Sequence, residues 1–234
     1  MIPVIYNNKN KILIVLFTII IVFCIYESTC LNPEVKIYDS KLDGPTILFI
    51  SGTHGNEKAP VFAMDEFFKT RRPTVGKAII IDNVNYCGFL ANTRNLPSFT
   101  TNININREYD DIDDNHLNDI ITKYINKVDY VFDFHEAAEY QYLDFNKLGN
   151  SVSTDMNPID TKNIINLLNE RHDVVPWVSY IRPAEKLIKG SLFDYCVLNN
   201  INYTLLESST YADMSLRIQQ HNIILNYIYN KYLS

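Results

Sequence analysis

His54 and Glu57 are the first residues along the chain whose types and spacing suit metal binding. They lie three positions apart in the segment SGTHGNE at 51–57, directly after an apolar run. An imidazole and a carboxylate on such a turn can converge on one ion, and zinc accepts both kinds of ligand. The pair alone is a weak signal, because a solvated pair or a histidine satisfied in the core would give the same pattern.

His135 supplies a third potential ligand, in the segment DFHE at 133–136. Residues 133 and 135 of a strand point to the same face, so Asp133 could orient the imidazole. A catalytic zinc site needs three protein ligands and one open position. We therefore predict one Zn²⁺ per chain, bound by His54, Glu57 and His135, with a lone buried histidine as the alternative for His135. The other histidines have loop or helical surroundings and are expected to be structural: His116, His172 and His221.

Glu207 follows an apolar run, in the segment LLES at 205–208. A carboxylate at the end of a buried strand lies in a partly dry place, where burial raises its pKa and suits it to proton transfer. The alternative is a surface carboxylate at a strand exit. Arg94 and the pair Asn106–Arg107 lie in a polar stretch, and guanidinium groups bind carboxylates and stabilise oxyanions. Taken singly, each arginine could equally be a solvated charge.

The elements that must position these residues alternate between strands and helices. Strands are predicted over 46–50, 78–81, 128–134, 174–181 and 203–206. Helices are predicted over 59–69, 117–125, 161–171, 192–198 and 216–233, and residues 83–112 are predicted to form a long polar loop. Continuous apolar strands alternating with helices indicate an α/β sheet covered on both faces, which binds ligands at the carboxyl ends of its strands. We expect one domain over residues 31–234.

Residues 12–26 form an uncharged, almost wholly apolar run, ILIVLFTIIIVFCIY, preceded by Lys9 and Lys11. The run is shorter than the ~20 residues that span a bilayer comfortably, and it suits a signal peptide or a short uncleaved anchor. A buried strand or core helix is the weaker alternative. The basic flank keeps the N-terminus cytoplasmic. We therefore expect residues 1–30 to target the protein to the membrane, with the remainder anchored facing the lumen or exterior, or secreted after cleavage.

Composition excludes several classes of protein. The 234 residues are 47% hydrophobic with seven glycines, which excludes collagen-like and linker-like chains. The net charge is −6 and no basic stripe is present, so we predict no nucleic-acid partner. The sequence contains no G-x-S-x-G motif of a serine hydrolase. Outside the apolar run lie three cysteines, an odd number that leaves at least one thiol free or intermolecular: Cys30, Cys87 and Cys196.

In this order the motifs resemble the zinc carboxypeptidase superfamily, and within it the succinylglutamate desuccinylase/aspartoacylase family. The resemblance covers residues 45 to 230 and implies a carboxypeptidase-like mixed sheet with helices on both faces. No single motif decides it, but six in the right order are specific. They are GTHGNE at 52–57, the N-x-N-Y-x-G-F segment at 83–89, Asn106–Arg107, DFHE at 133–136, GSLFDY at 190–195 and LLES at 205–208.

The resemblance implies a zinc-dependent amide hydrolase that acts on an N-acyl amino acid or on a peptide C-terminus with a free carboxylate. Glu207 would be the general base and acid for a zinc-activated water, and Arg94 would polarise the scissile carbonyl. Asn106 and Arg107 would hold the substrate carboxylate. Aspartoacylases carry an arginine ten residues before the catalytic glutamate, where this chain has Val197, which argues against N-acetylaspartate as the substrate.

Two further departures from the family affect these expectations. Glu108 places a negative charge beside the predicted carboxylate clamp. The chain ends after the closing helix, without the β-rich domain of aspartoacylases, so a more open pocket is expected. A non-catalytic binding module of the same fold, displayed on a membrane, is the alternative function. The complete set of ligand and base positions argues against that alternative.

Overall fold

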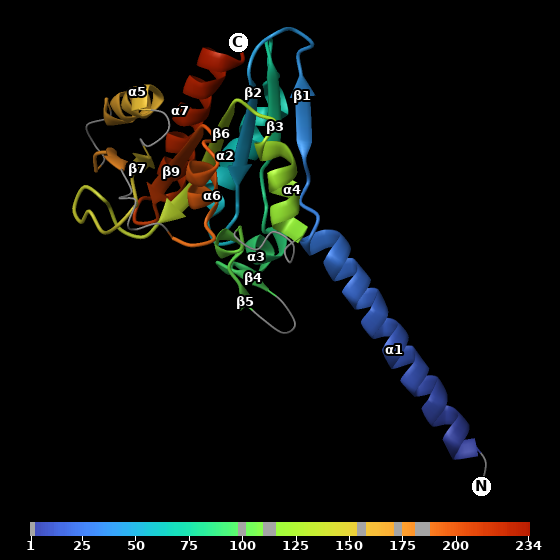
Figure 1. The fold of residues 1–234 in the computed structure, drawn as a ribbon. Coiled ribbons are helices and arrows are strands. Elements are labelled where there is room, and N and C mark those ends of the chain that lie inside the picture. Colours follow the sequence, from blue (N-terminus) through green and yellow to red (C-terminus); the bar gives the residue numbers. More distant parts are fainter. Residues whose placement is uncertain (1–2, 98–101, 110–115, 154–157, 171–174, 181–187) are drawn as a thin grey trace.

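The centre of the molecule is a seven-stranded mixed sheet, seen in a computed structural model that describes residues 3–97, 102–109, 116–153, 158–170, 175–180 and 188–234 (Figure 1). Neighbouring strands pair in parallel except at two antiparallel pairs, Lys36–Asp39 with Lys77–Ile81 and Ser151–Ser153 with Tyr203–Ser209. The predicted mixed α/β fold is confirmed. In sheet order the strands are β1 (Lys36–Asp39), β3 (Lys77–Ile81), β2 (Thr46–Ser51), β6 (Tyr130–Ala137), β9 (Tyr203–Ser209), β7 (Ser151–Ser153) and β8 (Val178–Tyr180).

Helices cover both faces of the sheet. One face packs against α2 (Lys58–Thr70), α5 (Pro158–Asn169) and α7 (Met214–Tyr232), and the other packs against α4 (His116–Ile125) and α6 (Leu192–Leu198). The central strands are buried on both sides, as their continuous apolar sequence predicts: every residue of β9 is buried, and so are all residues of β2 except the first. This burial fixes the strands whose carboxyl ends carry the predicted site.

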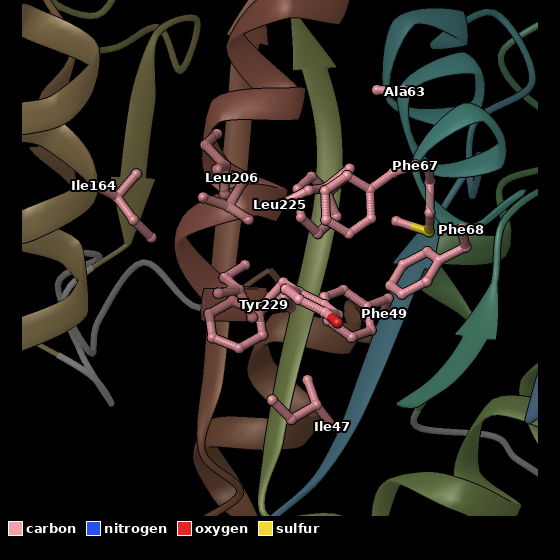
Figure 2. Close-up of a cluster of buried hydrophobic side chains, with 14 of the residues drawn as sticks. Ile47, Phe49, Ala63, Phe67, Phe68, Ile164, Leu206, Leu225 and Tyr229 are labelled. Atoms are coloured by element: carbon pink, nitrogen blue, oxygen red, sulfur yellow. The ribbon is translucent and has the colours of Figure 1, made fainter. Parts of the chain in front are cut away.

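Aromatic rings fill the core between the sheet and α2 (Figure 2). Phe49 of β2 meets Phe68 edge to face, with ring centroids 5.1 Å apart. Phe67 meets Tyr229 of α7 in the same way at 5.9 Å. Each such aromatic pair stabilises the fold by about 0.5–1.5 kcal/mol beyond the contribution of the surface area it buries. They hold α2 firmly on the sheet, and α2 begins directly after Glu57.

The stretch 83–112 is more structured than the sequence predicts. It contains α3 (Tyr86–Ala91), the short strands β4 (Leu96–Pro97) and β5 (Asn102–Ile103), and a 3₁₀ turn η1 (Ile105–Arg107). Local side chains define α3: the Asn85 Oδ1 accepts a hydrogen bond from the Gly88 amide at 2.9 Å, and Asn92 ends the helix with φ of 55°. A six-residue helix is too short to show a helical period in the sequence, so the prediction of a long unstructured loop was wrong.

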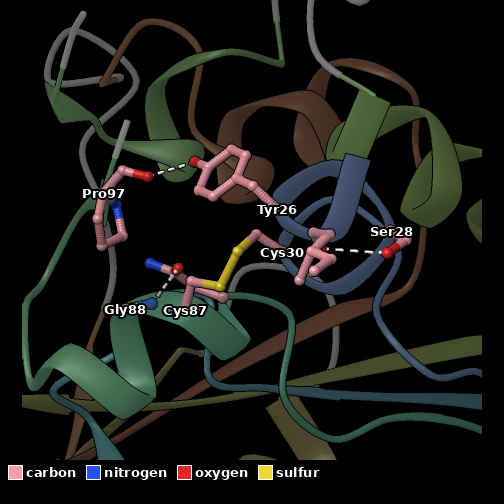
Figure 3. The surroundings of a disulfide bond; sticks show 8 residues. Tyr26, Ser28, Cys30, Cys87, Gly88 and Pro97 are labelled. Atoms are coloured by element: carbon pink, nitrogen blue, oxygen red, sulfur yellow. Dashed lines mark hydrogen bonds between the residues drawn. A yellow bond between two sulfur atoms is a disulfide. The ribbon is translucent and has the colours of Figure 1, made fainter. Parts of the chain in front are cut away.

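The helix α1 (Pro3–Cys30) leaves the body of the molecule (Figure 1), and the large apolar side chains from Ile12 to Ile25 are exposed. Its segment Asn10–Cys30 has 21 residues and a mean hydropathy of 2.5, long and apolar enough to cross a membrane. A disulfide joins Cys30 to Cys87 of α3, with Cα atoms 5.3 Å apart, and the Tyr26 hydroxyl donates to the Pro97 carbonyl (Figure 3). The sequence predicted an unpaired thiol, and Cys196 is that thiol, buried and outside any disulfide.

Candidate metal centre and catalytic cavity

The predicted ligands come from two neighbouring strands of the sheet. His54 lies on the turn that follows β2, and His135 lies on β6, which pairs with β2 in parallel. The turn depends on Gly52, whose φ of +68° favours glycine, and it closes with a hydrogen bond from the Glu57 amide to the His54 carbonyl at 3.1 Å. Because the strands run in parallel, their carboxyl ends bring these side chains together.

The three side chains converge on a single point. The Nδ1 of His54 lies 2.7 Å from the Glu57 Oε1, and the Nδ1 of His135 lies 2.7 Å from the Glu57 Oε2. One nitrogen or oxygen of each residue lies within 4.8 Å of those of the other two, and all three residues are buried. Within the described residues, this is a compact cluster of two imidazoles and one carboxylate at the end of the sheet.

The outer nitrogens of both imidazoles are held by hydrogen-bond acceptors. The Nε2 of His135 lies 3.1 Å from the Asp133 Oδ2, and the Nε2 of His54 lies 3.2 Å from the Asn104 Oδ1. That amide is oriented by the Asn106 backbone N–H, which donates to the same Asn104 oxygen at 3.1 Å. Binding of a cation would require both rings to be neutral, with each Nε2 donating its proton outward and each Nδ1 presenting a lone pair inward.

In that state the two imidazoles and the Glu57 carboxylate offer three donor groups to one cation. Burial alone would lower the pKa of His135, yet the carboxylates of Asp133 and Glu57 raise it well above its ordinary value. Burial also works to raise the pKa of Glu57, but the imidazoles of His54 and His135 hold it well below the usual range. The surroundings therefore stabilise positive charge at this point, and the donor set of two nitrogens and a carboxylate fits Zn²⁺.

Glu207 lies beside His135, because β6 and β9 pair in parallel with these two residues in register. It is 8% exposed, and burial raises its pKa to about 8. Arg94 reaches the cluster from the segment after α3: its Nη1 donates to the Glu57 Oε1 at 2.8 Å. Its backbone carbonyl accepts from the Gly55 amide at 3.2 Å, which ties this segment to the turn that carries His54.

A cavity of about 420 Å³ opens onto these groups. Its lining includes Glu57, Glu207 and two cations: Arg94, which pairs with Glu57 at 2.8 Å, and Lys147, which pairs with Glu139 at 2.9 Å. The remaining lining residues are Asn56, Glu136, Ala137, Ala138, Asn146, Leu148 and Thr210. A hollow with a candidate metal cluster, a buried carboxylate and two cations can hold a polar substrate that carries a negative group.

Asn106 and Arg107 lie apart from that lining. The Asn106 Oδ1 accepts a hydrogen bond from the Leu192 amide at 2.8 Å, which ties η1 to the first turn of α6. Arg107 is exposed, and its backbone packs so closely on Gly190 that a Cβ there would lie 2.1 Å from the Arg107 carbonyl oxygen. The structure thus gives Asn106 a supporting contact within the fold and does not place either side chain in the cavity.

Two other residues near the cluster were not singled out from the sequence. Asn104, beside the predicted clamp, contacts the His54 ring. Glu136 is buried, accepts from the Ala59 amide at 3.0 Å and pairs with Arg217 of α7. The sequence could have indicated this role of Glu136 through its position directly after His135. Side chains alternate across a strand, so residue 136 faces α2 and α7, on the opposite side of the strand from His135.

His221 is a core histidine, as its helical surroundings suggest. Its Nε2 lies 2.9 Å from the Ser208 Oγ, and its ring packs 5.7 Å from that of Phe134. Burial lowers its pKa to about 3, so the ring is neutral. His172 and the side chain of His116 lie outside the described residues.

The candidate metal centre lies within a region that matches a known protein family. Residues 43–148 match the succinylglutamate desuccinylase/aspartoacylase catalytic domain, a span that includes all three candidate ligands and Arg94. The predicted resemblance to this family is confirmed. No functionally curated protein matches the chain significantly.

Solved structures show the same fold. Product-bound Csd4, a cell shape determinant from Helicobacter pylori, is 16% identical with a TM-score of 0.68, covering 86% of this chain and 55% of that one. A succinylglutamate desuccinylase from a Silicibacter species is 15% identical with a TM-score of 0.63, covering 86% of this chain and 61% of that one. This chain spans somewhat more than half the length of these proteins, and the likeness establishes a shared fold.

Proposed function

We propose that the protein is a zinc-dependent hydrolase of amide or peptide bonds. The observation that carries the proposal is the convergence of His54, Glu57 and His135 within 4.8 Å, with Glu207 in register beside His135. Metal-assisted hydrolysis needs a bound metal, an adjacent carboxylate that can transfer protons and a cationic side chain, and this site offers a place for each. We assign the catalytic domain to residues 31–234 and an anchoring segment to residues 1–30.

When bound, Zn²⁺ supplies a Lewis acid that polarises a carbonyl and lowers the pKa of water toward ~7. His54, Glu57 and His135 hold the ion, and Asp133 orients His135 through its Nε2–H. Glu207 accepts a proton from the attacking water and delivers it to the leaving nitrogen, a role that suits a carboxylate whose pKa burial raises to about 8. Arg94 donates to the oxyanion that develops on the scissile carbonyl.

We propose that the substrate carries a free carboxylate, as an N-acyl amino acid or a peptide C-terminus does. Arg94 and Lys147 give the cavity wall its positive charge, and Lys147 is the one we assign to the carboxylate. Asn106 and Arg107 do not line this cavity, and their role as a carboxylate clamp stays a prediction. Peptide substrates gain support from Csd4, which is described as a D,L-carboxypeptidase and whose structures include a tripeptide-bound form.

We propose that the catalytic domain works outside the cytoplasm, held to the membrane by α1. The disulfide between Cys30 and Cys87 is typical of an oxidising compartment. The apolar span of α1 ends at the same cysteine, so the helix continues directly into the folded domain.

The zinc content of the purified protein tests the proposed metal site. Protein purified with zinc should contain about one Zn²⁺ per chain, and His54→Ala or His135→Ala should lose it. Glu136→Gln is the matched control, because Glu136 is buried beside the cluster but bonds the Ala59 amide and Arg217. A wild-type protein without zinc, or one whose zinc survives both histidine changes, would contradict the assignment and favour a binding module of the same fold.

The substrate class is tested by screening the zinc-loaded protein. One panel contains N-acyl amino acids and the other contains short peptides with free or amidated C-termini. Release of an amino acid from the free-acid peptides alone identifies a carboxypeptidase, whereas release of a carboxylic acid from the first panel identifies a deacylase. Equal cleavage of free and amidated peptides would exclude recognition of a carboxylate.

A further inference from the structure

The end of α1 is built into the catalytic domain. Cys30 is 4% exposed and belongs to the core cluster under α4 and α6, and the partly buried side chains of Tyr26 and Leu31 pack against that cluster. The Tyr26 hydroxyl donates to the Pro97 carbonyl of β4 (Figure 3). Only residues 31–35 separate α1 from β1. The helix is therefore joined to the domain by packing and a disulfide, without a long flexible linker.

The length of the apolar span sets the height of the domain above a bilayer. The 21 residues Asn10–Cys30 rise about 31 Å as a helix, which matches the ~30 Å hydrocarbon core of a membrane. A helix that spans this core therefore reaches its surface at Cys30. Because Cys30 is bonded to Cys87, the helix α3 must lie at the same level, in the interfacial zone of lipid headgroups.

The face of α3 that carries Cys87 also exposes an apolar side chain. Leu90 lies three residues after Cys87, so both lie on one face of the helix, and Leu90 is 63% exposed. Exposed apolar residues of α1, such as Phe23 and Ile25, continue this surface on the membrane side of the disulfide. Figure 1 shows α3, β4 and β5 at the end of the sheet beside which α1 leaves the body.

We propose that the α3 face formed by Cys87 and Leu90 contacts the outer surface of the lipid bilayer, which holds the candidate catalytic edge of the sheet next to the membrane. The inference rests on the proposed anchoring by α1 and is independent of the hydrolytic activity. Its consequence is that substrates attached to, or concentrated at, the membrane surface reach the cavity directly. The hollow beside the end of α1 is lined by Glu34 and Asp65, so the bilayer to test first is zwitterionic.

Tryptophan fluorescence in the full-length protein tests this contact. The chain has one tryptophan, Trp177, which is buried and gives a constant background in the parent protein. Leu90→Trp and Leu42→Trp are matched variants, because both leucines are 63% exposed. Leu42 lies just before the amino end of β2, whereas α3 follows the carboxyl end of β3, so the two positions lie at opposite ends of the strands. Phe17→Trp, in the middle of the apolar span, reports insertion of α1.

Each variant is reconstituted in unbrominated phosphatidylcholine nanodiscs and in nanodiscs with brominated acyl chains; the bromines lie near the headgroups for Leu90→Trp and Leu42→Trp, and near the chain ends for Phe17→Trp. We expect the added fluorescence of Leu90→Trp and Phe17→Trp to be lost in brominated lipid, and that of Leu42→Trp to be unchanged. Quenching of Phe17→Trp without Leu90→Trp would overturn the α3 contact while leaving the anchor intact. Quenching of neither would overturn both, and equal quenching at residues 42 and 90 would overturn the proposed orientation.

Discussion

His135 on β6 and Glu207 on β9 lie directly across from each other in adjacent parallel strands. Side chains at paired positions of a parallel sheet emerge on the same face, so the register fixes the separation of ligand and carboxylate without help from a loop. Every residue of β9 is buried, and so are all residues of β6 except its first and last. The candidate base is thus held by the buried centre of the sheet.

Glu207→Gln should keep zinc but lose hydrolysis. The amide has nearly the same shape as the carboxylate yet cannot accept the water proton, so we expect turnover to fall by about 10²–10⁴-fold. Initial rates with the best substrate from the screen, together with zinc content, measure the two effects separately. Turnover near that of the wild type would eliminate Glu207 as the base.

Arg94→Ala should reduce turnover more than it reduces stability. The side chain is 47% exposed, so its loss costs little folding energy, but a donor to the developing oxyanion is worth about 10²–10³-fold in rate. Arg94→Lys should recover part of this, because lysine supplies a charge without the planar fork of donors. Rates and melting temperatures of the two variants are the measurements, and a Lys variant no better than Ala would argue against an electrostatic role.

Breaking the disulfide should weaken the fold. The Cys30–Cys87 bond closes a loop with a sequence separation of 57, which in the loop-entropy account stabilises the protein by about 4 kcal/mol. We expect Cys87→Ser to lower the urea midpoint and to make the protein insensitive to reductant. Cys24→Ser, at an exposed thiol outside the disulfide, is the control. A wild-type midpoint unchanged by reductant would show that the bond does not form.

The protein should lose stability as the pH falls below about 6.5, in part through His221. Its pKa is lowered from 6.5 to about 3 by burial, so between these values the unfolded chain binds a proton that the folded chain does not. The free energy of unfolding should therefore decrease on acidification through this window, with a slope approaching ~1.4 kcal/mol per pH unit from this group. Urea unfolding at several pH values measures the slope, and His221→Gln should flatten it; identical slopes would refute the assignment.

Much of this architecture is readable from the sequence, for physical reasons that differ between elements. The runs at 46–50 and 203–206 are buried on both faces, so their continuous apolar character predicts strands at β2 and β9. His54 and His135 stand out because strand ends are where polar residues interrupt apolar runs. The short elements between residues 83 and 107 escape prediction, since α3 is specified by Asn85 and Asn92 instead of by a period.

The contacts made by the predicted clamp residues escape prediction for a different reason. Asn106 carries a side chain suited to a substrate, but its amide oxygen is occupied by the Leu192 backbone N–H, 86 positions along the chain. A contact at that separation leaves no trace in local spacing. Asn104, two positions earlier, contacts the His54 ring for the same reason: tertiary packing decides which asparagine of the segment faces the cluster.

The contact between Gly55 and Gly88 links the position of His54 to that of α3. A Cβ on Gly55 would lie 2.0 Å from the Gly88 carbonyl carbon, so the turn next to His54 rests directly on the backbone of α3. One position before Gly88, Cys87 is bonded to the end of α1. The distance between the candidate metal-binding turn and the end of α1 is thus set by a direct backbone contact and one disulfide. Any side chain at position 55 would shift His54 and the end of α1 relative to each other.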